Sequence, residues 1–273
     1  MQVVLTGTGS PLPSATRAGP STLVLAGETR LLVDAGRGVV MRMMAVGIRP
    51  DDLDGVLITH MHSDHVCALN DVITTHWVRT RELKPLRIWG PVGTARLVER
   101  TLFMLEDDIG YRTDHHEPLV DGPQVVVTEL APGDAFDIGG VHVTTAATAH
   151  APVHPTIGFR FEHDGSVAAL VGDTLPCEGV DRLAADADVY VQTVLRRDIV
   201  EQLPGEMAQD ILEYHSSVVD AARTAARVGA RRLAMTHMVP APEPEQYPEW
   251  ISRAAEHFDG EIVIGDDLTT IAV

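Results

Sequence analysis

The sequence predicts an α/β protein in which two mixed β-sheets lie between outer helices. Three observations lead to this fold class. Short strand patterns alternate with helical patterns in the first half of the chain, a run of strand patterns follows in the middle, and strands followed by helices return in the final third. No low-complexity linker separates these parts. We therefore expect residues 1–273 to form a single domain.

The first half of the chain predicts strands with helices between them. Apolar residues alternate weakly over 2–6 before a glycine-rich turn, and Gly27-Glu28 separates two β-rich runs in the manner of a hairpin. Residues 55–59 form a continuous apolar run of strand length, the kind that is buried on both faces. The expected strands are 2–6, 21–26, 30–34, 55–59 and 86–89, and the expected helices are 39–46, 68–80 and 94–105.

The middle of the chain predicts a second sheet, and the final third continues the alternation of strands and helices. Three strand-like runs and a shorter fourth follow one another in the middle without a helical pattern between them. The expected strands are 125–130, 141–147, 157–162, 168–171, 189–193 and 232–236, and the expected helices are 218–228 and 248–257.

Composition and charge exclude several classes of function. Apolar residues make up 45% of the chain and charged residues 22%, values of an ordinary globular protein. The formal net charge of −18 repels phosphate backbones unless basic side chains gather on one face, which disfavours a generic nucleic-acid-coating role. The chain has two cysteines, no signal-like N-terminus and no apolar run near the ~18 residues of a membrane span. We therefore expect a soluble cytoplasmic protein.

The segment 59–65 concentrates metal-ligand chemistry directly after a predicted buried strand. It reads Thr-His-Met-His-Ser-Asp-His, so three imidazoles and a carboxylate fall within six positions. Neutral imidazole and carboxylate are ligands of zinc. In such a loop His60 and His62 can face one way while Asp64 and His65 face the other, so one loop can serve two metal ions. A solvated histidine-rich turn is the alternative, and the dense ligand set at the end of a strand disfavours it.

The His-x-His-x-Asp-His spacing over 60–65 resembles the signature of the metallo-β-lactamase superfamily, metallohydrolases with a four-layer αβ/βα sandwich. The resemblance implies three further ligands, and His150, Asp173 and His237 follow later predicted strands in the required order. The implied ligand sets are His60, His62, His150 and Asp173 for one metal, and Asp64, His65, His237 and a shared Asp173 for the other.

The same resemblance assigns roles to neighbouring residues. His154 offers an alternative third ligand, but the spacing to Gly158 favours His150. Asp34, at the end of its predicted strand, resembles a buried carboxylate that orients the ligand loop by hydrogen bonds, with an ordinary turn carboxylate as the alternative. The other histidines lack such context and are expected on the surface or as hydrogen-bonded structural residues, with the pair at 115–116 a candidate for the pocket mouth: His76, His115, His116, His142, His163 and His257.

Two metal ions that share a hydroxide supply a nucleophile at neutral pH, because coordination lowers the pKa of water to about 7. We therefore expect a dinuclear zinc hydrolase, with Mn²⁺ or Fe²⁺ as alternatives, whose bridging hydroxide attacks an anionic ester. His215 is predicted to protonate the leaving group from the start of the helix over 218–228. The alternative is that Ser216 or Ser217 caps this helix and His215 is incidental. The predicted catalytic residues are Asp64, which is also a ligand, and His215.

Within the superfamily, local features resemble the ribonuclease Z branch, phosphodiesterases that remove the 3′ trailer from precursor tRNA. The matching segments are the glycine loop at 5–10, Val-Asp-Ala-Gly-Arg-Gly at 33–38, His-Ser-Ser at 215–217 and, for actinobacterial members, 108–112 and 155–160. The resemblance implies a phosphodiesterase with precursor tRNA as a candidate substrate. It also implies a homodimer, for which the helix over 39–46 is a candidate contact surface and a core-facing helix is the alternative.

Some features depart from that branch and leave other functions open. Its members insert a long glycine- and proline-rich arm between the third histidine and the bridging aspartate, whereas 22 residues separate His150 from Asp173 here. A small-molecule esterase of the same fold, acting on an aryl sulfate, lactone or cyclic nucleotide, is therefore the alternative function. A di-iron redox protein and a non-catalytic metal-stabilised binding protein are weaker alternatives, because His62 replaces the expected carboxylate of the former and all seven ligands are present.

Overall fold

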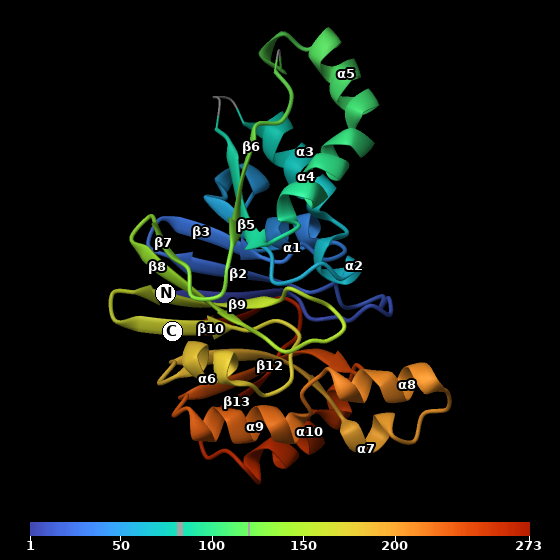
Figure 1. Ribbon diagram of the computed structural model, residues 1–273, viewed down its shortest axis with the longest axis vertical. Helices are drawn as coiled ribbons and strands as arrows, with labels where there is room; N and C mark the ends of the chain where they lie inside the picture. The colour runs from blue at the N-terminus through green and yellow to red at the C-terminus, as the bar shows by residue number, and fades with distance from the viewer. Residues whose placement is uncertain (81–83, 120) are drawn as a thin grey trace.

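The computed structural model describes residues 1–80, 84–119 and 121–273, which form two facing seven-stranded sheets with helices outside them (Figure 1). The strand orders are β14-β1-β2-β3-β4-β5-β6 and β13-β12-β11-β10-β9-β8-β7. Both sheets contain parallel and antiparallel pairs. This is the four-layer αβ/βα arrangement, so the predicted fold class is confirmed.

The first sheet holds the strands of the N-terminal half. The turn at 27–28 joins β2 to β3 in an antiparallel hairpin, as predicted, and β3 to β6 run parallel. The chain's last strand, β14, returns to pair with β1 at the edge. The strands are β1 (Gln2–Gly7), β2 (Ser21–Ala26), β3 (Thr29–Val33), β4 (Gly55–Leu57), β5 (Leu86–Pro91), β6 (Val125–Leu130) and β14 (Thr269–Ala272).

The second sheet is antiparallel at one end and parallel at the other. Strands β7 to β10 pair antiparallel, and β10 to β13 pair parallel. The strands are β7 (Ala135–Ile138), β8 (Val141–Ala147), β9 (Ile157–His163), β10 (Ser166–Leu170), β11 (Val189–Leu195), β12 (Arg232–Val239) and β13 (Glu261–Ile264).

Helices cover the outer face of each sheet (Figure 1). The helices on the side of the first sheet are α1 (Val39–Ala45), α2 (Ser63–Val66), α3 (Leu69–Arg79), α4 (Thr94–Met104) and α5 (Glu106–His115), of which α5 projects beyond α3 and α4. The helices on the side of the second sheet are α6 (Glu178–Ala184), α7 (Arg197–Val200), α8 (Glu206–Asp210), α9 (Val218–Arg227) and α10 (Tyr247–Ala255), of which α7 and α8 lie to one side of the others. In the described part of the chain, none of these helices combines the length and apolar character needed to cross a membrane.

Three clusters of buried apolar side chains hold the layers together. One lies between the sheets and includes Leu57 of the first sheet and Phe159 of the second. Another joins the first sheet to α1 and α3, with Met43 among its members. The third joins the second sheet to α6, α9 and α10, and Trp250 is its largest side chain. Burial of both sheet faces explains why β4 is a continuous apolar run and why every residue of β11 is buried, Gln192 and Thr193 included.

One strand lies in a different sheet from the one predicted. Residues 125–130 were expected in the second sheet, but β6 pairs parallel with β5 at the edge of the first sheet. The polar connection before it contains α5, which has no buried residue and therefore no apolar face for periodicity to reveal. The sequence patterns also missed α6 and the short strands β7, β13 and β14, which have four residues each.

Candidate metal centre

The histidine-rich loop and the later candidate ligands meet at the ends of strands from both sheets. The loop that carries His60 follows β4, and His150 and Asp173 follow β8 and β10, while His237 lies near the end of β12. Because β3 runs parallel to β4, and β10 to β12 are mutually parallel, their carboxyl ends gather at one edge of each sheet. The facing sheets bring these edges together.

The backbone bends sharply at three positions in this region. Asp34 and His237 have φ angles of 60° and 47°, which residues with a Cβ seldom adopt. Such conformations persist where the surrounding structure demands them, and they concentrate at functional sites. Gly172 has a φ of 65°, and a Cβ there would lie 3.0 Å from the side chain of Thr59. The bends direct the neighbouring side chains into one space.

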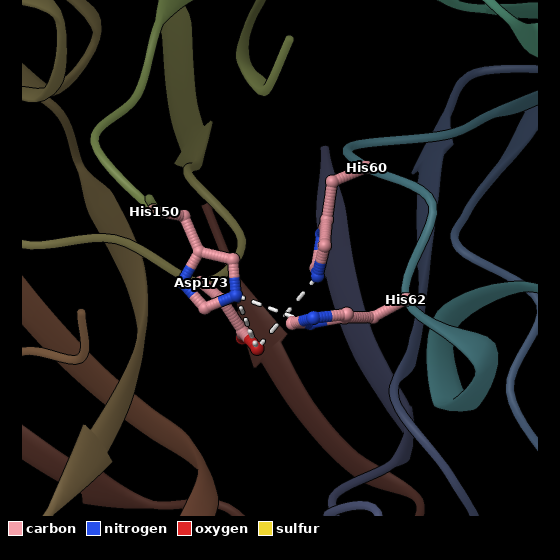
Figure 2. Close-up of side chains that lie close together, drawn as sticks. All are labelled: His60, His62, His150 and Asp173. Carbon is pink, nitrogen blue, oxygen red and sulfur yellow. Dashed lines mark hydrogen bonds and ion pairs between the residues drawn. The ribbon is translucent and has the colours of Figure 1, made fainter. Parts of the chain in front are cut away.

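The candidate ligands form two groups, and within each group one donor atom of every residue lies within 4.8 Å of the others. The first group is His60, His62, His150 and Asp173 (Figure 2), and the second is Asp64, His65 and His237. Asp173 Oδ2 lies 3.9 Å from Nε2 of His60 and of His150. It lies 3.4 and 3.6 Å from Nε2 of His65 and of His237. One carboxylate oxygen therefore faces both groups.

Asp34 sets the orientation of one histidine in each group. His65 Nδ1–H donates to Asp34 Oδ2 at 2.7 Å, and the Thr59 hydroxyl donates to the same oxygen at 2.8 Å. Because the Thr59 proton is used there, its oxygen accepts from His60 Nδ1 at 2.9 Å. Both imidazoles therefore carry their proton on Nδ1 and present the Nε2 lone pair to the centre. A buried carboxylate that fixes ligand tautomers in this way raises metal affinity.

A backbone carbonyl fixes the third histidine of the first group. His150 Nδ1–H donates to the carbonyl oxygen of Tyr214 at 2.9 Å, so its Nε2 carries the lone pair. That Nε2 lies 3.1 Å from Nδ1 of His62, close enough for the two nitrogens to share one hydrogen or one cation. Figure 2 shows His60 and His62 pointing from one side toward His150 and Asp173 on the other.

The unsatisfied atoms of the cluster fit a pair of divalent cations. His60 Nε2, His65 Nε2 and Asp173 Oδ1 are buried without a hydrogen-bond partner in the described residues, and the two nitrogens face Asp173. Buried polar atoms normally have partners, so three such atoms in one cluster are free to bind cations. Imidazole nitrogen and carboxylate oxygen are donors that zinc, manganese and iron accept. The arrangement has the two His/Asp groups typical of a dinuclear metallo-β-lactamase site.

Burial and nearby charges keep the imidazoles of the first group neutral and its carboxylate ionised, which are the states that bind a metal ion. Burial lowers the pKa of His60, His62 and His150, in the last case to about 4, so these imidazoles are neutral at pH 7. Burial alone would raise the pKa of Asp173, but His237 and His65 outweigh it and hold that pKa well below its usual range. The carboxylate is therefore ionised.

The second group behaves differently in the absence of a metal. Burial lowers the pKa of His65 and His237, but the nearby carboxylates, Asp173 first among them, together outweigh it, so each pKa lies above its usual value of 6.5. Asp34 and Asp64 add to the increase. A metal ion at this group must displace these protons, so we expect its affinity to rise with pH.

These opposite shifts predict that the metal-free protein is most stable near pH 6.5. Below this pH the unfolded chain binds protons at positions 60, 62 and 150 that the folded chain does not, so stability falls as the pH drops toward 4. Above it the folded chain retains protons on His65 and His237 that the unfolded chain loses, so stability falls as the pH rises. Melting temperatures of chelator-treated protein from pH 4 to 9 measure this. A continuous rise through pH 8 would contradict it.

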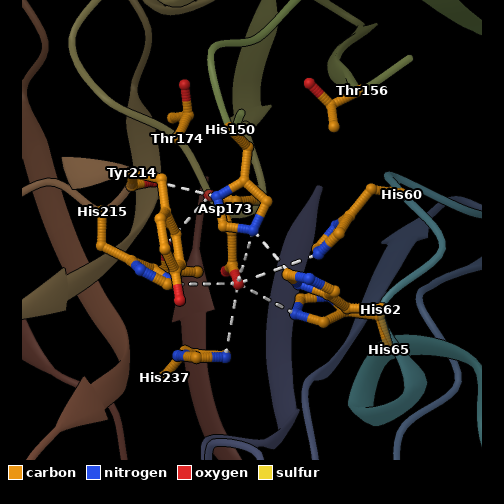
Figure 3. Close-up of polar contacts among 12 residues, drawn as sticks. His60, His62, His65, His150, Thr156, Asp173, Thr174, Tyr214, His215 and His237 are labelled. Atoms are coloured by element: carbon orange, nitrogen blue, oxygen red, sulfur yellow. Dashed lines mark hydrogen bonds and ion pairs between the residues drawn. The ribbon is translucent and has the colours of Figure 1, made fainter. Parts of the chain in front are cut away.

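His215 stands beside the shared carboxylate, outside both groups. Its Nε2 lies 3.2 Å from Asp173 Oδ2, and its Nδ1 lies 3.2 Å from the carbonyl oxygen of Ile211 (Figure 3). Neither oxygen can donate, so both bonds form together only when both ring nitrogens carry hydrogen. Ser217 caps α9 in a reciprocal bond with Asp220, as the alternative interpretation expected. The cap and the His215 contact coexist, since the cap fixes the segment that carries His215.

The remaining histidines lie outside the cluster. His154 is exposed and belongs to neither group, whereas His150 belongs to the first. His76 is buried, and its ring nitrogens lie 2.9 Å from the carbonyl oxygens of Pro50 and Lys84, which accept hydrogen bonds from the ring. His115 and His116 are exposed at the end of α5.

Sequence reasoning missed two residues that shape the centre. Thr59 links Asp34 to His60, and Tyr214 places its half-buried ring 5.1 Å from that of His150 and 4.7 Å from that of His215 (Figure 3). Burial raises the pKa of the Tyr214 phenol, which therefore stays protonated. Each residue directly precedes a predicted site histidine in the sequence, and this position was the only feature that could have pointed to it.

Replacement of Asp34 by asparagine is expected to weaken metal binding about 10–100-fold, the usual effect of losing a carboxylate that orients a ligand. The amide nitrogen cannot accept from both Thr59 and His65, so the two Nδ1 tautomers lose their support. Competition with a fluorescent chelator measures the affinity. Asp54→Asn is the matched control, because Asp54 accepts a backbone bond from Arg30 on the same sheet. Equal affinity in the two variants would contradict the role of Asp34.

The fold and the paired His/Asp groups are those of a metal-dependent hydrolase of the metallo-β-lactamase superfamily. The family model described as Beta-lactamase superfamily domain matches residues 29–238. The metallo-β-lactamase fold protein YhfI from Bacillus subtilis has a TM-score of 0.77 at 19% identity, covering 99% of this chain and 98% of that one. The short form of human tRNase Z has a TM-score of 0.74 at 23% identity, covering 100% and 99%.

Sequence similarity identifies the family within this superfamily. Ribonuclease Z of Mycobacterium bovis is 50% identical over 275 aligned positions, which cover all of this chain and 98% of the relative. Ribonuclease Z of Mycobacterium tuberculosis is 49% identical over the same coverage. The chain belongs to the ribonuclease Z family of metal-dependent hydrolases, and the predicted resemblance to its actinobacterial members is confirmed.

Proposed function

We propose that the protein is a dinuclear zinc phosphodiesterase that releases the 3′ trailer of precursor tRNA. One observation carries the proposal: Asp173 faces both His/Asp groups and also contacts His215, the predicted proton donor. The family relationship supports an RNA phosphodiester as the substrate. The contacts of His215 support a reaction whose leaving group needs a proton.

Two ligand sets would hold the metal ions. They are His60, His62, His150 and Asp173 for one ion, and Asp64, His65, His237 and the shared Asp173 for the other. When bound, the ions supply a nucleophile from water at neutral pH and neutralise the charge of the phosphodiester. The donor set suits zinc, and Mn²⁺ or Fe²⁺ are the other candidates.

The chain's own residues orient these groups and deliver the proton. Asp34 and Thr59 hold His60 and His65 with their Nε2 lone pairs toward the centre. His215, with hydrogen on both ring nitrogens, gives the Nε2 proton to the leaving oxygen. The carbonyl of Ile211 keeps the ring in place after the transfer. The loop is anchored by Ser216, whose hydroxyl and N–H both donate to the carbonyl of Thr174 at 2.6 and 2.9 Å.

We also propose that the protein works as a cytoplasmic homodimer with α1 in the interface. Met41 and Met44 on this helix are 76% and 47% exposed, and adjacent exposed apolar side chains favour a protein contact. Light scattering is expected to give twice the chain mass for the wild type and the chain mass for Met41→Asp. Wild-type protein at the chain mass would contradict the dimer.

Comparison of kcat/KM across substrate classes tests the proposed function. Zinc-loaded protein is given precursor tRNA with a labelled 3′ trailer, mature tRNA without one, and a panel of small substrates with aryl sulfate, lactone and cyclic nucleotide groups. Trailer release with the highest kcat/KM of the set is expected, and mature tRNA should stay intact. Hydrolysis of a small substrate with precursor tRNA uncut would overturn the assignment in favour of a small-molecule esterase.

A further inference from the structure

A cavity of about 340 Å³ lies at the carboxyl end of β11 beside the start of α9. Its volume lies in the range of small-ligand sites. Leu195 and Ser217 both line it. The N–H of Leu195 donates to the carbonyl of Ser216 at 3.0 Å. The wall of this cavity is therefore continuous with the loop that carries His215.

Four arginines line the cavity, although the chain as a whole carries a net charge of −18. They are Arg196, Arg197, Arg223 and Arg253, and the carboxylates beside them are Asp198, Glu201 and Asp220. With Glu249, which lies 2.6 Å from Arg196 and 3.4 Å from Arg253, four anions stand against the four arginines, so the charge here is balanced on an otherwise acidic protein. A chain of net negative charge can hold a polyanion only where its own negative charge is offset locally.

The three carboxylates are already engaged. Asp198 lies 2.8 Å from Arg196 and 2.9 Å from Arg253. Asp220 accepts from the N–H and hydroxyl of Ser217 in the helix cap. Glu201 lies 3.8 Å from Arg197. Arg223, on the second turn of α9, is exposed and forms no ion pair with any described residue.

Two guanidinium groups at the cavity have unused donors. The side chain of Arg196 is only 3% exposed, and its Nε and Nη2 bind Asp198 and Glu249, yet Nη1 has no partner in the described residues. Arg253 Nε is likewise buried without a partner there. Buried donors rarely stay unpaired, so both guanidinium groups keep a donor that a further acceptor could use.

We propose that this cavity binds a backbone phosphate of the RNA strand next to the scissile bond, an inference that rests on the proposed function. Arginine forms paired, charge-assisted hydrogen bonds with phosphate oxygens. The N-terminal end of α9, a ten-residue helix, adds a favourable dipole. The phosphate would be held beside the segment that positions His215, so the same contact that binds the strand would align it for cleavage.

The test compares Arg223→Gln with Arg100→Gln. Arg100 is also exposed on the second turn of a helix, α4, and forms no ion pair with a described residue, so both variants are expected to fold. Fluorescence anisotropy of a labelled single-stranded RNA, titrated with metal-free protein at several salt concentrations, gives the binding constant as a function of salt. Loss of one phosphate contact should reduce the slope of log binding constant against log salt concentration by about 0.7 in magnitude, which weakens binding about fourfold at 0.15 M salt. With zinc, KM for precursor tRNA should rise similarly in Arg223→Gln alone, with hydrolysis of bis(p-nitrophenyl) phosphate unchanged.

The outcomes separate this inference from the proposed function. If the wild type releases the trailer and Arg223→Gln keeps the wild-type slope, affinity and KM, the cavity does not bind phosphate and the inference is wrong. If the wild type leaves precursor tRNA uncut but the RNA affinity still drops only in Arg223→Gln, the phosphate site stands and the proposed function fails. Equal losses in Arg223→Gln and Arg100→Gln would also overturn the inference, because they would show a general charge effect.

Discussion

Replacement of His215 by alanine is expected to lower kcat for precursor tRNA about 10²–10⁴-fold, the usual contribution of a positioned proton donor. A ribose oxygen leaves poorly without a proton. The p-nitrophenolate of bis(p-nitrophenyl) phosphate leaves without one, so its hydrolysis should change little. Metal content should stay at the wild-type value, because His215 belongs to neither His/Asp group. Steady-state kinetics on both substrates, with metal analysis of the same samples, measure the effect.

His154→Ala is the matched control for this variant. His154 is exposed, lies four residues from His150 and belongs to neither group, so both activities should equal those of the wild type. An equal loss of activity on both substrates in His215→Ala would contradict a role in protonation. It would instead indicate that the contact between His215 and Asp173 supports the metal site.

Replacement of Asp173 by asparagine is expected to have the largest effect on the centre. The variant loses the carboxylate oxygen that faces both groups, while its volume is preserved. We expect fewer than two metal ions per chain and a loss of at least about 10²–10³-fold in kcat on both substrates, the scale for removing one stabilising group from a preorganised site. Metal analysis after gel filtration and kinetics at fixed metal concentration measure these effects.

Asp188→Asn separates this effect from the loss of a half-buried structural carboxylate elsewhere in the fold. Asp188 accepts from the N–H of Val167 and pairs with Arg231 at 2.8 Å on the same sheet. That variant is expected to keep two metal ions and wild-type kcat. Full metal content and activity in Asp173→Asn would show that this carboxylate does not bridge the groups.

The parts of the fold with strong periodicity could be predicted from the sequence. The hairpin of β2 and β3, the buried run of β4 and the amphipathic α9 all have patterns set by burial on one or both faces. Sheet membership is a long-range property, so the local pattern of β6 could not show that it pairs with β5. The edge strands β13 and β14 have four residues each, too few for a clear alternation.

The candidate site was more predictable than the fold around it. Ligand residues are rare types in a fixed order after strands, so the family pattern located all seven residues that the two groups contain. Thr59 could not be predicted, because its hydrogen bonds to Asp34 and His60 depend on how the loop after β4 turns. The cavity lined by four arginines contains residues far apart in the sequence, such as Arg196 and Arg253. They come together only through the packing of α9 against the end of β11 and against α10.

Titration of the metal-free protein with Zn²⁺, while release of a labelled 3′ trailer from precursor tRNA is followed, tests the two-metal phosphodiesterase most directly. If the reaction needs a metal ion in each His/Asp group, cleavage should rise up to two equivalents of Zn²⁺ per chain. Asp64→Ala, which removes a donor from the second group, should release no trailer at any ratio. Full cleavage without Zn²⁺, at one equivalent, or by Asp64→Ala would contradict the account.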